Sequence, residues 1–234
     1  MPRTRAPDRL EDIADGALDV FLQKGYRRTR MTDVAETAGV SPGLLYTYAA
    51  SKEALFRLVL LRELGVGLDQ TSLPAPTPSA DDVQALIRRA LRDLGTIPTL
   101  DAAADTADPT DASAELAAIV GEHYDRVQRY RRVISLVERS SFDWPELADR
   151  FYRRGRRPFV SRLGEYIARR VKSGHFAPVP DPDVAARFVI ETVAWFANHR
   201  YGDYDGAQID DRLARDTVIR LIVAAFVRRA ERPA

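Results

Sequence analysis

Cysteine is absent from this chain of 234 residues. The absence excludes disulfide bonds, thiolate metal ligands and a cysteine nucleophile. Histidine is scarce as well: His123, His175 and His199 are the only three, and they are too scattered to form a pair of metal ligands at helical spacing. We therefore expect neither a metal site nor a cofactor.

Long apolar runs and enzyme motifs are also missing. No stretch of about 18 residues is free of charge, as a membrane-spanning helix would require. Residues 1–15 lack the apolar segment of a secretory signal peptide. We expect a cytoplasmic protein with no membrane partner. The chain has no nucleophile–histidine–acid arrangement, glycine-rich phosphate loop or H-E-x-x-H motif, so we do not expect an enzyme.

Charge of one sign is not in excess. The chain has 35 Lys and Arg against 34 Asp and Glu, for a formal net charge of +1. The whole molecule therefore has no strong field to attract a polyanion, and local groups would have to supply such contacts. The basic residues that could do so near the start of the chain are Arg3, Arg5, Lys24, Arg27, Arg28 and Arg30.

Apolar residues recur at the three- and four-residue spacing of helices, and strand-like alternation persists nowhere. The sequence predicts an all-α fold, with an N-terminal three-helix region over residues 1–51 and a longer helical region over 52–234. Two short helices are expected between residues 31 and 48, and loops over 70–80 and 97–113. The longer predicted helices are 9–24, 52–68, 82–95, 114–140, 145–173, 182–201 and 209–230.

The segment from Met31 to Leu55 has the pattern of two short helices joined by a glycine turn. Thr32 is expected to cap the first helix, and Gly39 can take the left-handed conformation that ends it. Ser41 can cap the second helix, which has Pro42 at its first position. This is the pattern of a helix-turn-helix, which inserts its second helix into the major groove of DNA.

The residues of this segment that form a specific signature are Gly25, Tyr26, Thr29, Thr32, Ala35, Ala38, Gly39, Val40, Ser41, Gly43, Leu45, Tyr46, Tyr48, Lys52, Glu53 and Leu55. On these residues, positions 8 to 58 resemble the DNA-binding region of the tetracycline-repressor (TetR) family of bacterial transcription regulators. The resemblance implies an all-helical homodimer with a variable ligand-binding C-terminal domain, and repression relieved by a small molecule. On this basis residues 1–51 are expected to form a three-helix DNA-binding head with the helix-turn-helix, and residues 52–234 a helical domain for ligand binding and dimerisation. Ala49 departs from the large aromatic residue common in the family, and Phe56 is expected to fill that space.

The second short helix would present one face to double-stranded DNA. Because it lacks Arg, Asn and Gln, we expect no strong bidentate base contacts from it. For Tyr46 the alternative is a core aromatic that braces the two helices. The residues expected to face base edges are Pro42, Gly43, Leu44, Tyr46 and Thr47. The residues expected to reach phosphates are Thr29, Thr32, Ser41, Tyr48 and Lys52.

The last two predicted helices are apolar around more of their circumference than packing on one core requires. We interpret the surplus as a two-fold dimer interface; the alternative is a helix buried centrally in its own chain. The residues assigned to the interface are Phe188, Trp195, Phe196, Ile222 and Phe226.

An unidentified small-molecule effector is expected in the C-terminal domain, with His123, Tyr124, Phe142 and Trp144 as candidate pocket residues. The alternative for these aromatic residues is a role in the core. An arginine run between 150 and 157 is interpreted as a solvated helix face, with an anionic ligand or partner as the alternative. The sequence thus predicts a homodimeric repressor that a ligand releases from a palindromic operator. The alternative function is an effector-independent regulator or activator on the same scaffold.

Overall fold

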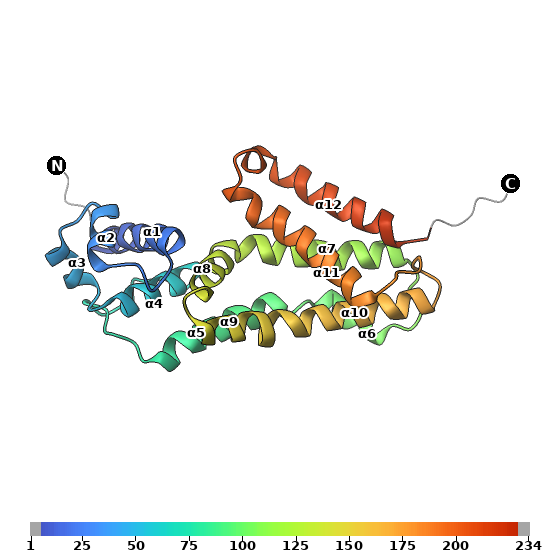
Figure 1. Ribbon diagram of the computed structural model, residues 1–234, viewed down its shortest axis with the longest axis horizontal. Helices are drawn as coiled ribbons and strands as arrows, with labels where there is room; N and C mark the ends of the chain where they lie inside the picture. Colours follow the sequence, from blue (N-terminus) through green and yellow to red (C-terminus); the bar gives the residue numbers. More distant parts are fainter. Residues whose placement is uncertain (1–5, 229–234) are drawn as a thin grey trace. The chain divides into compact units, whose positions relative to one another are not determined.

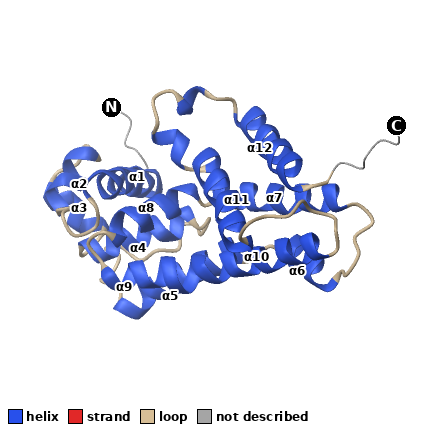
Figure 2. Ribbon diagram, turned by 45° about the vertical axis from the view of Figure 1, so that its right-hand side comes forward, coloured by secondary structure: helices blue, strands red, loops and turns tan. Residues whose placement is uncertain are grey.

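The structure is a computed structural model that describes residues 6–228. All regular elements in this range are helices, which confirms the all-α prediction (Figures 1 and 2). None of the described helices is both long and apolar enough to cross a membrane. Arg3 and Arg5, named above among the basic residues that could contact a polyanion, lie outside the described residues.

The chain folds into two compact units, each built from two stretches of sequence. Unit 1 contains the residues up to Asp93 together with Arg132–Tyr152. Unit 2 contains Leu94–Arg131 together with the residues from Arg153 onward. The division of function at residue 51 stays a prediction. By packing, the helix that follows residue 51 belongs to the same unit as the helices before it.

Unit 1 is organised around its first helix, which packs against the second and the fourth (Figure 1). Leu18 and Phe21 of the first helix and Leu55 of the fourth are fully buried in this core. Gly16 permits the close approach of the second helix, since a Cβ there would lie 3.1 Å from the Cβ of Ala38. The helices of this unit are α1 (Ala6–Lys24), α2 (Met31–Thr37), α3 (Pro42–Tyr48), α4 (Lys52–Glu63), α5 (Ala80–Gly95), α8 (Arg131–Ser141) and α9 (Pro145–Ala148).

Helix α4 is shorter than predicted, because it ends at Glu63 and not near Leu68. Gly65 adopts a left-handed conformation with φ of 73°. The Gly65 N–H donates to the Arg62 carbonyl at 2.8 Å, and the Val66 N–H donates to the Leu61 carbonyl at 2.9 Å, which closes the helix end. The expected long rigid helix from Lys52 to Leu68 is therefore wrong.

The loop of residues 64–79 turns back to the end of α3. The Ala75 N–H donates to the Tyr48 carbonyl at 2.8 Å, and the Ala50 N–H donates to the Ala75 carbonyl at 3.0 Å. Ala49 and Ala75 are both buried and form an isolated parallel bridge. The small residue at position 49 is thus covered by backbone of the 64–79 loop. Phe56, expected to fill that space, packs instead on Phe21 with ring centroids 5.3 Å apart.

Unit 2 packs α7 against α11 and α12, and α10 against α11 (Figure 2). A short helix, α6, replaces part of the loop predicted over 97–113, because Ile97, Leu100 and Ala103 recur at helical spacing and are buried. The predicted helix 114–140 is interrupted at Tyr130, and the predicted helix 145–173 is in three pieces. The elements are α6 (Pro98–Asp105), α7 (Ala112–Arg129), the π-helix η1 (Asp149–Arg156), α10 (Arg157–Lys172), α11 (Pro182–Ala197), the 3₁₀ turns η2 (His199–Gly202) and η3 (Gly206–Gln208), and α12 (Asp211–Phe226).

Two arginines lie inside unit 2 with all of their charge compensated locally. Arg170, 1% exposed, pairs with Glu115 at 2.8 Å. Arg200, fully buried, donates to the Ile209 carbonyl at 2.8 Å and pairs with Asp211. Buried charges persist only with such partners, so these groups serve the fold.

The arginine run between 150 and 157 also makes internal contacts. Arg150 donates to the side chain of Gln84 within unit 1. Arg156 pairs with Glu191 of α11 within unit 2. These two members of the run therefore hold other elements in place.

Candidate nucleic-acid interface

Helices α2 and α3 form the predicted helix-turn-helix. Val34 and Leu45 are fully buried and fix the two helices against the core of unit 1. Gly39 has φ of 64° in the turn, as its position predicted. The Ser41 hydroxyl accepts the Leu44 N–H at 3.2 Å and caps α3. The turn geometry expected from the sequence is therefore confirmed.

The capping of α2 differs from the prediction, because Arg30 and not Thr32 is the N-cap residue. Asp33 performs the capping role: its carboxylate accepts the Arg30 N–H at 2.8 Å and pairs with Lys24 at 2.9 Å. The hydrogen bond from Lys24 holds the pKa of Asp33 below its usual value. Thr32 is left exposed in the first turn of α2.

The side chains expected to face base edges all lie on the open side of α3. Leu44 is 41% exposed and Tyr46 is 50% exposed, whereas Leu45 between them is fully buried. Tyr46 is therefore not a core aromatic. The Thr47 hydroxyl donates to the Leu44 carbonyl at 2.7 Å, which leaves its oxygen as an acceptor. The five exposed residues are Pro42, Gly43, Leu44, Tyr46 and Thr47.

The residues expected to reach phosphates differ in their exposure. Thr29 is 2% exposed and its hydroxyl donates to the Gly25 carbonyl at 2.8 Å, so this side chain fixes the end of α1, and its phosphate contact stays a prediction. Thr32 and Ser41 are exposed, and Tyr48 is half-buried.

Lys52 lies against the segment that joins α1 to α2. Its ammonium donates to the Arg27 carbonyl at 3.2 Å and stands 4.7 Å from the centre of the Tyr26 ring. Burial lowers the pKa of Lys52, and the neighbouring Glu53 opposes that shift. The cation is thus held at one position beside the loop, which suits a group that contacts a phosphate.

An aromatic cluster supports this arrangement, and no spacing pattern along the chain predicted it. Tyr26 stacks on Trp144 with ring centroids 5.3 Å apart, and its hydroxyl donates to Glu53 at 2.9 Å. Phe56 meets the Tyr26 ring edge-on at 4.9 Å. Trp144, expected in a ligand pocket, is therefore part of the packing that supports the head.

The nearby basic residues include paired and exposed members. Lys24 pairs with Asp33, and Arg28 lies 3.7 Å from Asp143. Arg27 and Arg30 are exposed at the same end of unit 1. Exposed cations therefore lie next to the helix-turn-helix, although residues 6–62 contain eight basic and eight acidic side chains and so have no net excess of positive charge.

The four candidate pocket residues divide between the units, so neither unit contains the expected pocket by itself. In unit 1, Phe142 is 78% exposed. In unit 2, Tyr124 is fully buried and its hydroxyl donates to the Phe196 carbonyl at 3.1 Å. His123 is also buried, and neither ring nitrogen has a hydrogen-bond partner among the described residues. Burial lowers the pKa of His123 to about 4, so the ring is neutral at pH 7.

The residues assigned to a dimer interface fall into an exposed group and a buried group. Phe188 is 56% exposed and Trp195 is 38% exposed on α11, and Phe196 is half-buried. Ile222 and Phe226 are 1% and 5% exposed within the single chain, so they belong to the core of unit 2 and offer no surface to a partner. The exposed large apolar residues of α12 are Leu213 and Leu221.

Comparison with known proteins agrees with this geometry. The family model described as bacterial regulatory proteins, tetR family, matches residues 13–59. The model described as AefR-like transcriptional repressor, C-terminal domain, matches residues 112–229, about half of the chain.

Curated relatives are similar mainly in the head. The HTH-type transcriptional regulator BetI of Rhizobium meliloti is 35% identical over 88 residues, which are 37% of this chain and 43% of that protein. The regulator RutR of Escherichia coli K12 is 46% identical over 56 residues, 24% of this chain and 26% of that protein. The matches thus span less than half of the length of either relative.

A solved structure extends the likeness of the fold to nearly the whole chain. The ketosteroid transcriptional regulator KstR2 of Mycobacterium tuberculosis superposes with a TM-score of 0.55 at 16% identity, covering 96% of this chain and 98% of that one. With an exposed α3 on a helix-turn-helix and both family models matched, the chain belongs to the tetR family of bacterial regulatory proteins and is a DNA-binding transcriptional regulator.

Proposed function

We propose that this protein is a homodimeric repressor that binds a palindromic operator and leaves it when a small molecule binds unit 2. The observation that carries the proposal is the open face of α3, on which Leu44 and Tyr46 stay exposed while Leu45 anchors the helix. Apolar side chains on such a helix suit contact with thymine methyl groups. The match to an AefR-like repressor domain supports the repressor role.

Dimerisation through α11 and α12 is supported by their unpartnered apolar side chains. Val184, Phe188 and Trp195 recur along one side of α11 and are all exposed. Leu213 and Leu221 are exposed on α12, which packs against α11. A two-fold axis through these helices would give two copies of α3, and a palindromic operator requires them about 34–36 Å apart.

The effector site is proposed around His123 in unit 2. The ring lies 4.7 Å from that of Phe159, and neither of its nitrogens has a hydrogen-bond partner among the described residues. A matching effector would be mainly apolar and would present one hydrogen-bonding group to the neutral imidazole.

Transmission to the head is proposed to run through α8, which begins directly after α7 ends at Arg129. Arg139 of α8 donates to the Gln23 carbonyl of α1 at 2.9 Å. Arg132 lies 3.2 Å from Asp15 of α1, which also pairs with Arg62 of α4. A displacement of α8 would therefore act on both helices that carry the helix-turn-helix.

The test begins with selection of DNA bound by the purified protein from a random pool. We expect a palindromic sequence, bound by a dimer in sedimentation experiments, and then compounds that release it. A protein that selects no sequence at modest ionic strength would overturn the proposal. If DNA binds but no compound changes its affinity, or if transcription rises on binding, the effector-independent regulator or activator is the better description.

A further inference from the structure

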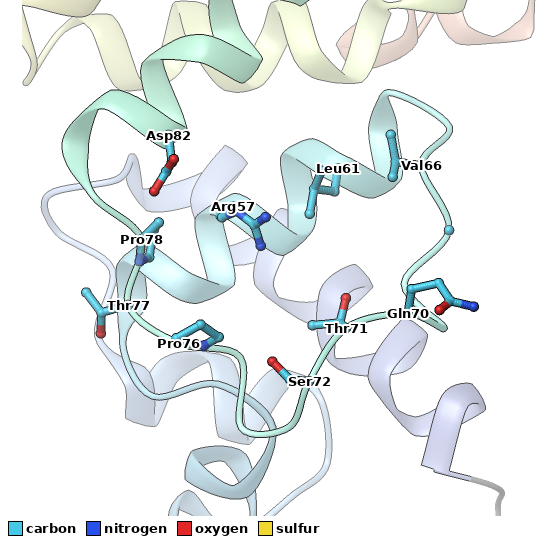
Figure 3. Close-up of a pocket in the computed structure, with 11 residues that line it drawn as sticks. Arg57, Leu61, Val66, Gln70, Thr71, Ser72, Pro76, Thr77, Pro78 and Asp82 are labelled. Carbon is cyan, nitrogen blue, oxygen red and sulfur yellow. The ribbon is translucent and has the colours of Figure 1, made fainter.

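A pocket of about 440 Å³ lies within unit 1, between α4, the 64–79 loop and the first turn of α5 (Figure 3). Its volume is in the range of sites for small molecules, about 300–1,000 Å³. Arg57 and Leu61 project into it from α4, and Thr71 and Ser72 face them from the loop, as Figure 3 shows. The remaining lining residues are Val66, Gly67, Gln70, Pro76, Thr77, Pro78 and Asp82.

The charged side chains among the residues that line the pocket are Arg57 and Asp82. Arg57 is half-buried, and its guanidinium makes no ion pair or hydrogen bond with any residue between 6 and 228. The nearby Asp82 carboxylate accepts the Ser79 hydroxyl at 2.8 Å and the Ser79 N–H at 3.0 Å. Those bonds, and the charge of Arg57, hold the pKa of Asp82 below its usual value.

The pair of charges selects a class of ligand. A guanidinium presents parallel N–H groups that match a carboxylate. The Asp82 carboxylate would repel a doubly charged phosphate but would accept a hydrogen bond from a hydroxyl or ammonium group. Leu61, Val66 and the prolines leave room for a short hydrocarbon portion. A small 2-hydroxy or 2-amino acid satisfies all of these groups.

The wall of the pocket is bonded directly to the end of α3. Pro76 lines the pocket, and the adjacent Ala75 makes the two backbone hydrogen bonds to Tyr48 and Ala50. Ala49, which is fully buried, is the position covered by this contact. A ligand that displaces the 64–79 loop would therefore move the end of the helix that faces DNA.

We propose that this pocket binds a small carboxylic acid bearing an adjacent hydroxyl or amino group, and that the bound acid changes DNA affinity through Ala75. The binding site stands independently of the proposed repressor mechanism, whereas the effect on DNA rests on that proposed function. The site is separate from the effector site around His123, which belongs to unit 2.

Binding is tested by calorimetric titration of the full chain with lactate, valine, acetate and inorganic phosphate at constant ionic strength. We expect lactate or valine to bind, and acetate to bind more weakly because it lacks the donor. Arg57→Gln should reduce the affinity about tenfold or more, as loss of a charged hydrogen-bonded pair does. Arg57→Lys keeps the charge but loses the parallel N–H groups, so its affinity should lie between those of the parent and Arg57→Gln. Arg88→Gln changes an exposed arginine of α5 and should bind the acids with the affinity of the parent.

The site would be overturned if neither lactate nor valine bound, if phosphate bound as tightly, or if Arg57→Gln bound the acids unchanged. Thermal melts of each variant establish that it is folded. For the coupling, anisotropy of a labelled selected DNA should shift with the acid in the parent and not in Arg57→Gln. Binding without such a shift refutes the link through Ala75 but keeps the site. Failure to bind any DNA refutes the proposed function, while the titration still decides the pocket.

Discussion

Individual side chains near α3 show which contacts the sequence could predict. Ser41 and Leu45 behave as expected, because capping and burial follow from spacing within one turn of helix. Thr29 does not, because its hydroxyl bonds to the Gly25 carbonyl four residues earlier. A signature shared with relatives identifies an important position but not whether its side chain points outward.

Lys52 provides the sharpest test of phosphate contact. Lys52→Ala should weaken binding to selected and random DNA alike and lower the salt slope by about one, because one counterion fewer is released. Affinity measured over a salt series gives this slope. Lys172→Ala, an exposed lysine at the end of α10, is the control and should leave both unchanged. A loss confined to the selected sequence would contradict a phosphate role.

His123 should make stability depend on pH. Its pKa in the folded chain is about 4, below the value of 6.5 for an ordinary histidine, so the unfolded chain binds the proton first. Stability should therefore fall as pH drops from 6.5 towards 4, by up to about 3 kcal/mol from this group. Denaturant melts of the parent and of His123→Phe measure the difference. Equal pH dependence in the two proteins would show that the ring is not buried in its neutral form.

At the scale of elements, the packing of α2 on α1 depends on the missing side chain of Gly16. Gly16→Ala would place a Cβ 3.1 Å from the backbone and Cβ of Ala38, and we expect a loss of about 1–3 kcal/mol in unfolding free energy. Gly43→Ala is the matched control in α3, because a Cβ there meets nothing within 4 Å. It should be neutral or should stabilise the fold by about 0.5–1 kcal/mol in denaturant melts. Equal losses in both variants would argue against the close approach of α1 and α2.

The elements that sequence reasoning missed depend on contacts distant along the chain. The bond between Ala75 and Tyr48 is made by backbone atoms, and no side-chain pattern encodes it. The end of α4 has a signal in the sequence, because Gly65 adopts the left-handed conformation that closes the helix. The prediction missed this signal because apolar residues continue at helical spacing as far as Leu68. Helix α6 was hidden by a composition of Ala, Asp and Thr that is equally common in loops.

At the scale of the whole molecule, the last helices illustrate an ambiguity of apolar patterns. Both α11 and α12 are apolar around more of their circumference than packing on one core requires, so the sequence alone did not determine which side of each helix faces its own core. Phe226 of α12 proved to pack on Phe176, with ring centroids 6.0 Å apart, while Phe188 of α11 remained exposed.

Phe188 and Trp195 should therefore control assembly. Phe188→Asp, or Trp195→Asp, should yield monomers in sedimentation and abolish binding to a full palindromic site, because a charge is costly in an apolar interface. Phe142→Asp is the control, since Phe142 is also exposed but lies in unit 1. A Phe188→Asp protein that still sediments as a dimer would place the interface elsewhere.

The composition of unit 1 from two separated stretches has a practical consequence for anyone who wishes to study the head alone. A gene fragment that stops at Asp93 would encode α1 to α4 and most of α5, without α8 and without Trp144, the stacking partner of Tyr26. Such a truncation would expose the aromatic cluster that Trp144 covers, and it would remove Arg132, one of the ion-pair partners of Asp15. To express the DNA-binding head alone, residues Arg132–Tyr152 should therefore be joined to the fragment through an engineered linker.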